Sequence, residues 1–319
     1  MDKIKKIIDW SQKIAIFCHE NPDGDAIWSI LWFWRLLEKL WKDVSYFSPD
    51  QPSKMFSFLK GFKKIKDKFD YWYYNLLIFL DFSEYSRLWV VFKNKEKYFQ
   101  ENEILVSAHH EIKDRPENWT IFNDTKATST CEIILENTLD IRESYYDEEI
   151  ATYLYLWLTT DSGNFRYDEN HERILKNALT LIQLWANKKL IIDNFINNKS
   201  MWSIKFLKTL LERLTEHGDI LYTYYDRDEL ANFNIDNEQA GYWLTIIQEI
   251  RWPKVIMTIR KEWEMIKWSL RSKDTNVEKI AKNFGGGWHI HASWFSTKID
   301  KDFETTKKNV IKKIDDLLQ

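Results

Sequence analysis

The stretch KIAIFCHENPDGDAIWSIL, residues 13–31, decides the fold class. Its apolar run Ile14–Cys18 predicts a short strand, and apolar residues at helical spacing predict a helix over residues 25–41. A strand followed at once by a helix is typical of βαβ units, in which parallel strands alternate with helices. Sheets of this kind carry their chemistry at the carboxyl ends of the strands.

The same alternation continues along the chain. Further strands of a largely parallel sheet are predicted at Val44–Phe47, Leu76–Leu80 and Ile104–Ser107. Helices are predicted at residues 147–159, 171–186 and 203–217. The sequence pattern then changes. Later strands are predicted at Ile220–Tyr225, Val255–Arg260 and Met265–Arg271. Later helices are predicted at residues 276–284 and 302–318.

These patterns predict an α/β fold with an N-terminal parallel-sheet domain over residues 1–190. A helical linker over residues 191–215 and a smaller α+β domain over residues 216–319 are predicted to follow. A length of 319 residues suits about two domains.

Composition excludes several classes of protein. The two cysteines rule out a disulfide framework and fit a reducing compartment. No apolar run approaches the length of a membrane span, and the N-terminus does not resemble a secretory signal. A balance of 46 Lys+Arg against 49 Asp+Glu argues against a protein that coats nucleic acid through a generally basic surface. We therefore expect a cytoplasmic protein with no membrane partner.

Polar side chains follow the predicted strands. His19, Asp23 and Asp25 lie on a tight turn after the first strand, where three nitrogen and oxygen ligands within seven residues favour a metal site over a helix N-cap. Asp81 ends Leu76–Leu80, although an aspartate that begins a turn is an equally good reading. His109-His110 follow a later strand and suit metal ligation or phosphate contact better than a surface pair. Asp161 lies in a glycine-containing turn.

The order of these motifs resembles the DHH phosphoesterase superfamily. The motifs are His-x-Asn-Pro-Asp-Gly-Asp, a strand-ending Asp, x-His-His and Thr-Asp-Ser-Gly. Leu270-Arg271-Ser272 and Gly285-Gly286-Gly287-Trp288-His289 resemble the domain associated with that family, so the likeness spans about residues 10–297. The chain is most similar to the nano-RNase and pAp phosphatase branch, whose members hydrolyse short oligoribonucleotides, pAp and, in some cases, dinucleotides.

The resemblance implies a centre of two Mn²⁺ ions, with Mg²⁺ or Co²⁺ as other candidates, in a cleft between the two domains. The implied metal ligands are His19, Asp23, Asp25, Asp81, His109 and Asp161. Asp81 would bridge the two ions, and His110 would contact the scissile phosphate. Two divalent ions about 3.5–4 Å apart can activate a water for in-line attack at phosphorus.

The associated domain is expected to hold the rest of the substrate. Backbone N–H groups of Gly285, Gly286 and Gly287 can approach a phosphate closely, and Arg271, Ser272 and His289 can add polar contacts. Ser129-Thr130 also matches a family element, although an N-cap pair explains it equally well. The implied partners are a small nucleotide or short RNA such as pApA, and a second copy of the chain in a homodimer.

Ala108 departs from the family pattern, because Asp-His-His gives the family its name and this chain has Ala108-His109-His110. Loss of a group beside metal ligands typically costs about 10–100-fold in metal affinity or activity. The alternatives are therefore a catalytically weakened nucleotide-binding protein, or an inorganic pyrophosphatase that shares the N-terminal motifs. Another alternative, a longer single-strand exonuclease of the superfamily, is disfavoured because it would need further nucleic-acid-binding domains.

The second departure is 17 Trp against 8 Gly. Tryptophan stands where the family shows glycine at Trp28, Trp41, Trp89, Trp157, Trp185, Trp288 and Trp294. We hypothesise that UGA codons read as glycine in the source organism underlie many of these tryptophans. The alternative is a chain that is naturally rich in tryptophan.

Overall fold

A computed structural model of the chain describes residues 2–20, 22–82, 95–112, 119–142, 145–162, 165, 171–288 and 290–318. The chain divides into two compact units, residues 1–198 and 199–319. Among the described residues, no helix has the length and apolar character needed to cross a membrane.

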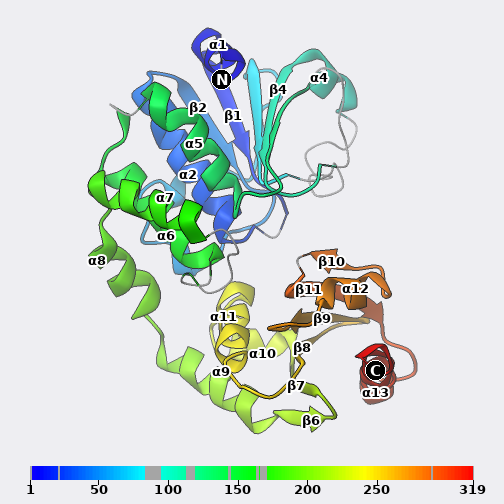
Figure 1. Ribbon diagram of the computed structural model, residues 1–319. Helices are drawn as coiled ribbons and strands as arrows, with labels where there is room; N and C mark the ends of the chain where they lie inside the picture. Colours follow the sequence, from blue (N-terminus) through cyan, green and yellow to red (C-terminus); the bar gives the residue numbers. More distant parts are fainter. Residues whose placement is uncertain are drawn as a thin grey trace. The chain divides into compact units, whose positions relative to one another are not determined.

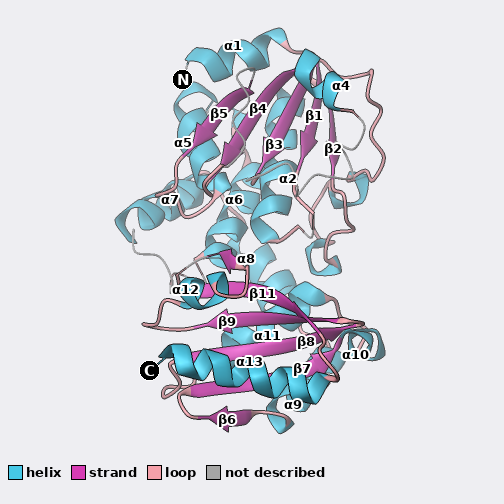
Figure 2. Cartoon of the chain, turned by 90° about the vertical axis from the view of Figure 1, so that its right-hand side faces the viewer, coloured by secondary structure: helices cyan, strands magenta, loops and turns pink. Residues whose placement is uncertain are grey.

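The first unit is built on a five-stranded, fully parallel sheet with the order β2-β1-β3-β4-β5 (Figures 1 and 2). Its strands are β1 (Lys13–Phe17), β2 (Asp43–Phe47), β3 (Leu76–Leu80), β4 (Glu103–Ala108) and β5 (Trp119–Asn123). The parallel sheet predicted from the sequence is thus confirmed. Strand β5 was not predicted, because its residues Trp119–Asn123 are short and bounded by charged and polar residues.

Helices cover both faces of this sheet. The described helices of this unit are α1 (Asp2–Trp10), α2 (Gly24–Lys39), α4 (Glu96–Glu101), α5 (Thr130–Arg142), α6 (Glu148–Asp161), α7 (His171–Gln183) and α8 (Lys188–Ile191), with short turns η1 (Lys54–Phe56), η2 (Phe62–Lys64) and η5 (Ile192–Ile196). One core cluster joins Ile14, Ile16 and Ile78 to α2, α5 and α6, and a second joins Phe17 and Phe79 to α4. Both strand faces are buried, which is why β1 and β3 are almost continuously apolar.

The second unit is built on a mixed sheet with the order β10-β11-β9-β8-β7-β6 (Figure 2). Its strands are β6 (Thr215–His217), β7 (Ile220–Asp226), β8 (Val255–Glu262), β9 (Met265–Arg271), β10 (Gly287–Trp288) and β11 (Ala292–Lys298). Among the described strands of this second sheet, only the β7–β8 pair is parallel. The sheet packs with α9 (Met201–Glu212), α10 (Arg227–Asn232), α11 (Asn237–Ile247), α12 (Val277–Lys282) and α13 (Phe303–Leu318).

The helix predicted over residues 203–217 is wrong at its end. Helix α9 ends at Glu212, and Thr215–His217 form strand β6, which pairs with β7. Gly218 has a φ of +55° and permits the tight turn between these two strands. Within the segment 191–215 that was predicted as a linker, Phe206 and Leu210 of α9 belong to the core of the second unit.

Two tryptophans close helices in a conformation that favours glycine. Trp41 has a φ of +59°, its N–H donates to the Glu38 carbonyl at 3.0 Å, and the next N–H, of Lys42, donates to Leu37 at 3.2 Å. Trp185 repeats this arrangement after α7 with a φ of +67°. This hydrogen-bond pattern is the Schellman motif, in which the left-handed position is usually glycine or asparagine.

At two other helix ends of this chain, the left-handed position of the same motif is occupied by the residue types that usually fill it. Asn234 fills the left-handed position after α10 with a φ of +48°, and Gly285 fills it after α12 with a φ of +77°. A left-handed conformation costs roughly 1–2 kcal/mol for a residue with a Cβ. Trp41 and Trp185 are therefore strained where glycine would not be.

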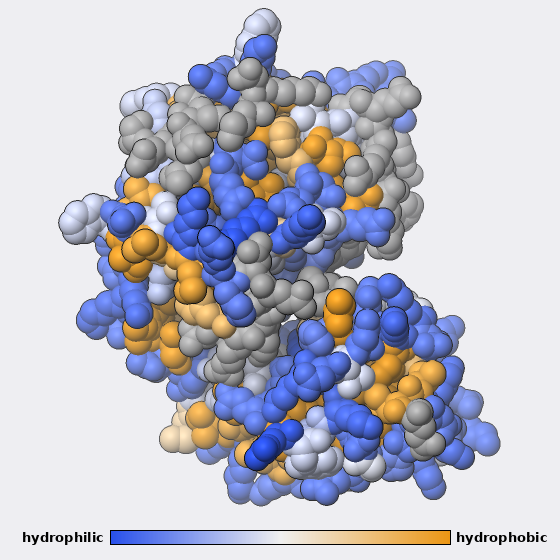
Figure 3. Space-filling view, viewed as in Figure 1, coloured by the Kyte–Doolittle hydropathy of each residue, from blue (hydrophilic) through white to orange (hydrophobic). Residues whose placement is uncertain are grey.

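Apolar side chains also reach the surface of the first unit (Figure 3). On α7, Leu175, Leu179 and Ile182 are between 44% and 59% exposed. Their spacing places them along one stripe of the helix.

Candidate metal centre

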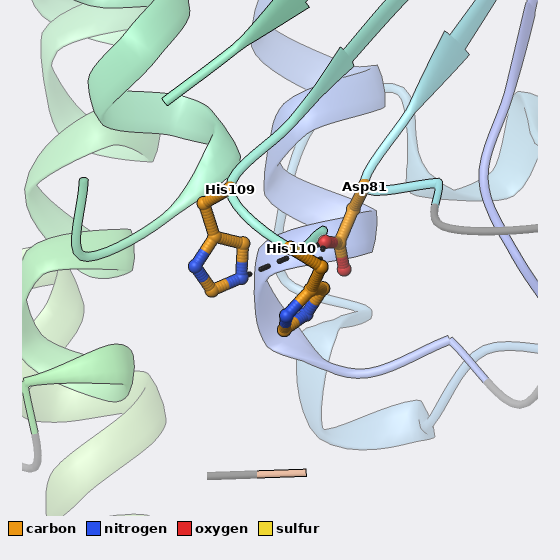
Figure 4. Close-up of side chains that lie close together, drawn as sticks. All are labelled: Asp81, His109 and His110. Carbon is orange, nitrogen blue, oxygen red and sulfur yellow. Dashed lines mark ion pairs between the residues drawn. The ribbon is translucent and has the colours of Figure 1, made fainter. Parts of the chain in front are cut away.

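The carboxyl ends of three neighbouring strands bring the predicted metal ligands together. His19 follows β1, Asp81 follows β3, and His109 and His110 follow β4, the strand next to β3. Asp81 Oδ2 lies 3.1 Å from His19 Nε2, and Asp81 Oδ1 lies 3.7 Å from His109 Nε2 and 3.6 Å from His110 Nε2. Figure 4 shows the imidazole rings of His109 and His110 beside the Asp81 carboxylate.

His19 is held in one orientation by its own backbone. Its Nδ1 lies 2.6 Å from the Glu20 carbonyl oxygen, which can only accept a hydrogen bond, so Nδ1 carries a proton. The Nε2 atom therefore faces Asp81 at 3.1 Å and Asp23 Oδ1 at 3.9 Å. A backbone partner on one ring nitrogen is the usual way in which the other nitrogen is oriented towards a metal.

Asp81 occupies an unusual conformation for a residue other than glycine. Its φ is +55°, and its N–H donates to the Ser107 carbonyl at 2.9 Å. Burial acts to raise the pKa of Asp81, but the hydrogen bond from His19 and the charges of His110, His19 and His109 outweigh it and hold the pKa well below its ordinary value. Strained backbone of this kind is concentrated at functional sites.

Asp23 and Asp25 lie at the start of α2 with different roles. Asp23 is the N-cap, because its Oδ1 accepts the Ala26 N–H at 3.1 Å. Asp25 lies in the first turn, is 3% exposed, and its Oδ2 lies 3.9 Å from His109 Nε2. Burial, with the charges of Asp81 and Asp23, raises the pKa of Asp25 well above its ordinary value. A bound cation would remove this unfavourable charge environment.

The start of α5 completes the centre. The Thr130 N–H donates to Asp25 Oδ2 at 2.9 Å, the Cys131 N–H donates to Asp25 Oδ1 at 3.4 Å, and the Thr130 hydroxyl donates to Asp81 Oδ1 at 3.3 Å. Sequence reasoning noted Ser129-Thr130 but did not connect it with the aspartates. The signal was Ser129 followed three residues later by Glu132, a capping-box pattern that marks a helix start.

Among the described residues, two groups of side chains could each hold a metal ion, and both contain Asp81. One is His19, Asp23 and Asp81; the other is Asp81, His109 and His110. Carboxylate and imidazole donors without thiolate suit Mn²⁺, Mg²⁺ or Co²⁺. Burial raises the pKa of the adjacent Cys18 thiol to about 12.

Ala108, the residue before the histidine pair, is fully buried in the apolar cluster that contains Phe17 and Phe79. The pair is nevertheless held in place, because the Asn123 side-chain amide donates to the carbonyls of Ala108 at 2.6 Å and His110 at 2.7 Å. The loop carrying the histidines is thus fixed without an acidic residue at position 108.

Asp161 ends α6, and its side chain lies outside the described residues, as does the turn at Gly163 that follows it. Two of the tryptophans that the family resemblance predicts to replace glycine lie on helices that carry predicted metal ligands. Trp28 of α2 and Trp157 of α6 are fully buried, and their indole N–H groups have no hydrogen-bond partner within the described part of the chain. An unpaired buried donor costs roughly 1–3 kcal/mol, so these sites are unfavourable for indole.

The predicted substrate residues lie in the second unit. Arg271 ends β9, and its Nη1 donates to the Leu270 carbonyl at 2.9 Å. Ser272 is buried and its N–H donates to the His291 carbonyl at 3.0 Å. His289 lies outside the described residues.

The glycine triplet has a structural reason at all three of its positions. Gly285 is the left-handed residue that ends α12. At Gly286 an added Cβ would lie 2.1 Å from the Trp294 carbonyl oxygen of β11. Gly287 begins β10 with a φ of +157°, a backbone conformation that residues with a Cβ rarely adopt. A Gly286 side chain is therefore excluded by packing against β11, whether or not the loop also binds phosphate.

Comparisons with known proteins agree with this architecture. Residues 13–157 match the DHH family, N-terminal domain. The chain is 24% identical over 314 residues to the bifunctional oligoribonuclease and PAP phosphatase NrnA of Mycoplasma genitalium, covering 95% of this chain and 94% of that protein. It is 26% identical over 297 residues to the protein of the same name from Thermus thermophilus, covering 91% and 87%.

Among solved structures, an exopolyphosphatase-related protein from Bacteroides fragilis matches 98% of this chain and 94% of its own chain, with a TM-score of 0.84 and 22% identity. This likeness shows a common fold. The chain therefore carries a DHH-family N-terminal domain over residues 13–157 and is homologous along most of its length to bifunctional oligoribonucleases and PAP phosphatases.

Proposed function

We propose that this protein is a metal-dependent phosphoesterase that hydrolyses short oligoribonucleotides, linear dinucleotides such as pApA, or pAp. The observation that carries the proposal is the pair of Asp/His groups that share Asp81 at the carboxyl edge of a parallel sheet. Such sharing is what a bridging carboxylate between two cations requires. The names of the two homologous proteins supply the substrate class.

Each predicted site residue has a role in this proposal. His19, Asp23, Asp25, Asp81 and His109, together with Asp161, would hold two Mn²⁺ ions, or Mg²⁺ or Co²⁺ in their place. Bound divalent cations lower the pKa of water and offset charge on a phosphate. His110 would contact the scissile phosphate and stabilise the charge that develops on it. Arg271, Ser272, Gly285–Gly287 and His289 would hold the remainder of the nucleotide.

The competing proposal is a nucleotide-binding protein with weakened catalysis. It is favoured by Ala108, whose methyl group belongs to an apolar cluster and supplies no acid or base. An inorganic pyrophosphatase is the third candidate.

One panel of substrates separates these candidates. We expect Mn²⁺-dependent release of mononucleotides from pApA, or of phosphate from pAp, and no turnover of pyrophosphate. Turnover of pyrophosphate alone would favour the pyrophosphatase. Binding of pApA without turnover would favour the weakened protein. Neither binding nor turnover of any nucleotide would overturn the proposed function.

We also propose that positions 41 and 185 are glycine in the natural protein and that UGA codons account for them. The support is the left-handed backbone of Trp41 and Trp185. Mass spectrometry of the protein isolated from its source organism tests this directly. Glycine at position 41 supports the proposal, and tryptophan there contradicts it.

A homodimer also remains a proposal. Light scattering of the purified chain tests it, with a mass of two chains expected. The exposed stripe Leu175, Leu179 and Ile182 on α7 is a surface to examine if that mass is found.

A further inference from the structure

Thr130, the first residue of α5, contacts carboxylates from two different elements. Its N–H donates to Asp25 on α2 at 2.9 Å, and its hydroxyl donates to Asp81 after β3 at 3.3 Å. Thr130 is fully buried and belongs to neither Asp/His group. We propose that Thr130 is a positioning residue, which fixes the Asp81 carboxylate relative to Asp25 so that the cation sites are formed before a cation binds. This inference rests on the proposed function.

The two carboxylates need such a residue because both are almost completely buried. A buried carboxylate is oriented by the donors that reach its oxygens, and charged acceptors make the stronger hydrogen bonds. Asp81 Oδ2 faces His19 Nε2 at 3.1 Å, and the Thr130 hydroxyl reaches the other oxygen. A rotation of the Asp81 carboxylate would therefore break contacts on both oxygens. The metal positions follow that orientation, because partners of the ligands set ligand geometry.

The start of α5 is itself fixed by contacts of Glu132 with the residues before it and with α7. The buried Glu132 accepts the Thr128 N–H at 2.8 Å, and the Ser129 hydroxyl accepts the Glu132 N–H at 3.3 Å. Glu132 also accepts from Asn177 Nδ2 of α7 at 2.8 Å and lies 3.5 Å from Arg173 Nε. Thr130 is thus attached to a fixed helix end, which is what a positioning role requires.

The test compares Thr130→Val with Thr130→Ser. Valine keeps the N–H that binds Asp25 and the shape of the side chain, and it removes the hydroxyl that binds Asp81. Serine keeps the hydroxyl. Thr138→Val is the matched control, because Thr138 is a buried threonine of the same helix whose hydroxyl contacts the Ile134 carbonyl at 2.7 Å and the Tyr146 hydroxyl at 2.6 Å.

The readouts are the Mn²⁺ dissociation constant, the unfolding temperature of the metal-free protein, and kcat/KM for pApA. For Thr130→Val we expect Mn²⁺ affinity to fall about 10-fold or more, with Thr130→Ser close to the wild type, as for other groups that orient metal ligands. Thr138→Val should lower the unfolding temperature and leave Mn²⁺ affinity unchanged. If Thr130→Val does not fold, the smaller Thr130→Ala replaces it with the same expectation.

Wild-type Mn²⁺ affinity in Thr130→Val would overturn the inference. An equal loss of affinity in Thr138→Val would also overturn it, because general loosening of α5 would then explain the effect. A wild-type protein that binds no Mn²⁺ and cleaves no nucleotide would instead overturn the proposed function.

Discussion

His19 Nε2 lies 3.1 Å from Asp81 Oδ2, although the two residues are 62 positions apart in the chain and each side chain is only 1% exposed. This contact exists because β1 and β3 are adjacent parallel strands, so the residues that follow them emerge at the same edge of the sheet. Burial of the His19 and Asp81 side chains has an unfavourable desolvation free energy. Buried polar pairs of this kind are typical of functional sites.

The metal-free protein should be stabilised by Mn²⁺. A ligand that binds only the folded state at 100 times its dissociation constant adds about 2.7 kcal/mol of stability. We expect the unfolding temperature to rise with Mn²⁺ and to return to its starting value with a chelator. Calorimetry measures both steps. An unfolding temperature that does not respond to Mn²⁺, Mg²⁺ or Co²⁺ would contradict the metal centre.

The two adjacent histidines should differ in their roles. We expect His109→Asn to weaken Mn²⁺ binding, since His109 is proposed as a ligand near both Asp25 and Asp81. His110→Asn should lower kcat for pApA by about 10²-fold or more, the size typical of removing a group that stabilises transition-state charge. Its Mn²⁺ affinity should stay near that of the wild type. If both variants lose Mn²⁺ equally, His110 is a ligand instead.

Introducing the family acid at position 108 tests whether the chain is weakened. We expect Ala108→Asp to raise kcat/KM for pApA by about 10–100-fold, the usual worth of a group that supports metal ligands. The same change should lower the free energy of unfolding, because a carboxylate enters a buried apolar cluster. Kinetics and denaturant titration measure the two effects. No turnover before or after the change would favour a nucleotide-binding protein.

Glycine at the helix ends should stabilise the chain. Removal of the left-handed Cβ should make Trp41→Gly and Trp185→Gly each more stable by about 1 kcal/mol. Trp72→Gly is the control, because Trp72 is also exposed, at 79%, but does not have a positive φ. That change should be neutral or destabilising, since glycine gains freedom in the unfolded chain. Equal effects in all three variants would contradict the glycine assignment.

The sequence predicted the sheet of the first unit well, because its strands are buried on both faces. Leu76–Leu80 is apolar throughout and β3 has those bounds. The resemblance to the DHH family, drawn from the order of motifs, is confirmed by the match over residues 13–157. Strand β11 was missed because its residues Ala292–Lys298 alternate between buried and exposed and carry serine and threonine.

The candidate site was predicted less completely. Histidines and aspartates at strand ends are visible in a sequence, since each directly follows an apolar run. The contacts of Thr130 with Asp25 and Asp81 span 105 and 49 positions, and a local pattern does not contain such separations. The role of Asn123 in holding the histidine loop was missed for the same reason, because it depends on the pairing of β4 with the unpredicted β5.

The central claim is that Asp81 joins the two groups into one catalytic centre. The most direct measurement is the initial rate of pApA hydrolysis with Mn²⁺ for the wild type and Asp81→Asn. Asparagine tolerates the left-handed backbone of position 81, so the variant changes the charge without adding strain. We predict a chelator-sensitive wild-type rate that falls by about 10²-fold or more in Asp81→Asn, as loss of a shared carboxylate requires. A rate within about twofold of the wild type, which is far smaller than the effect of losing a metal ligand, would contradict the account.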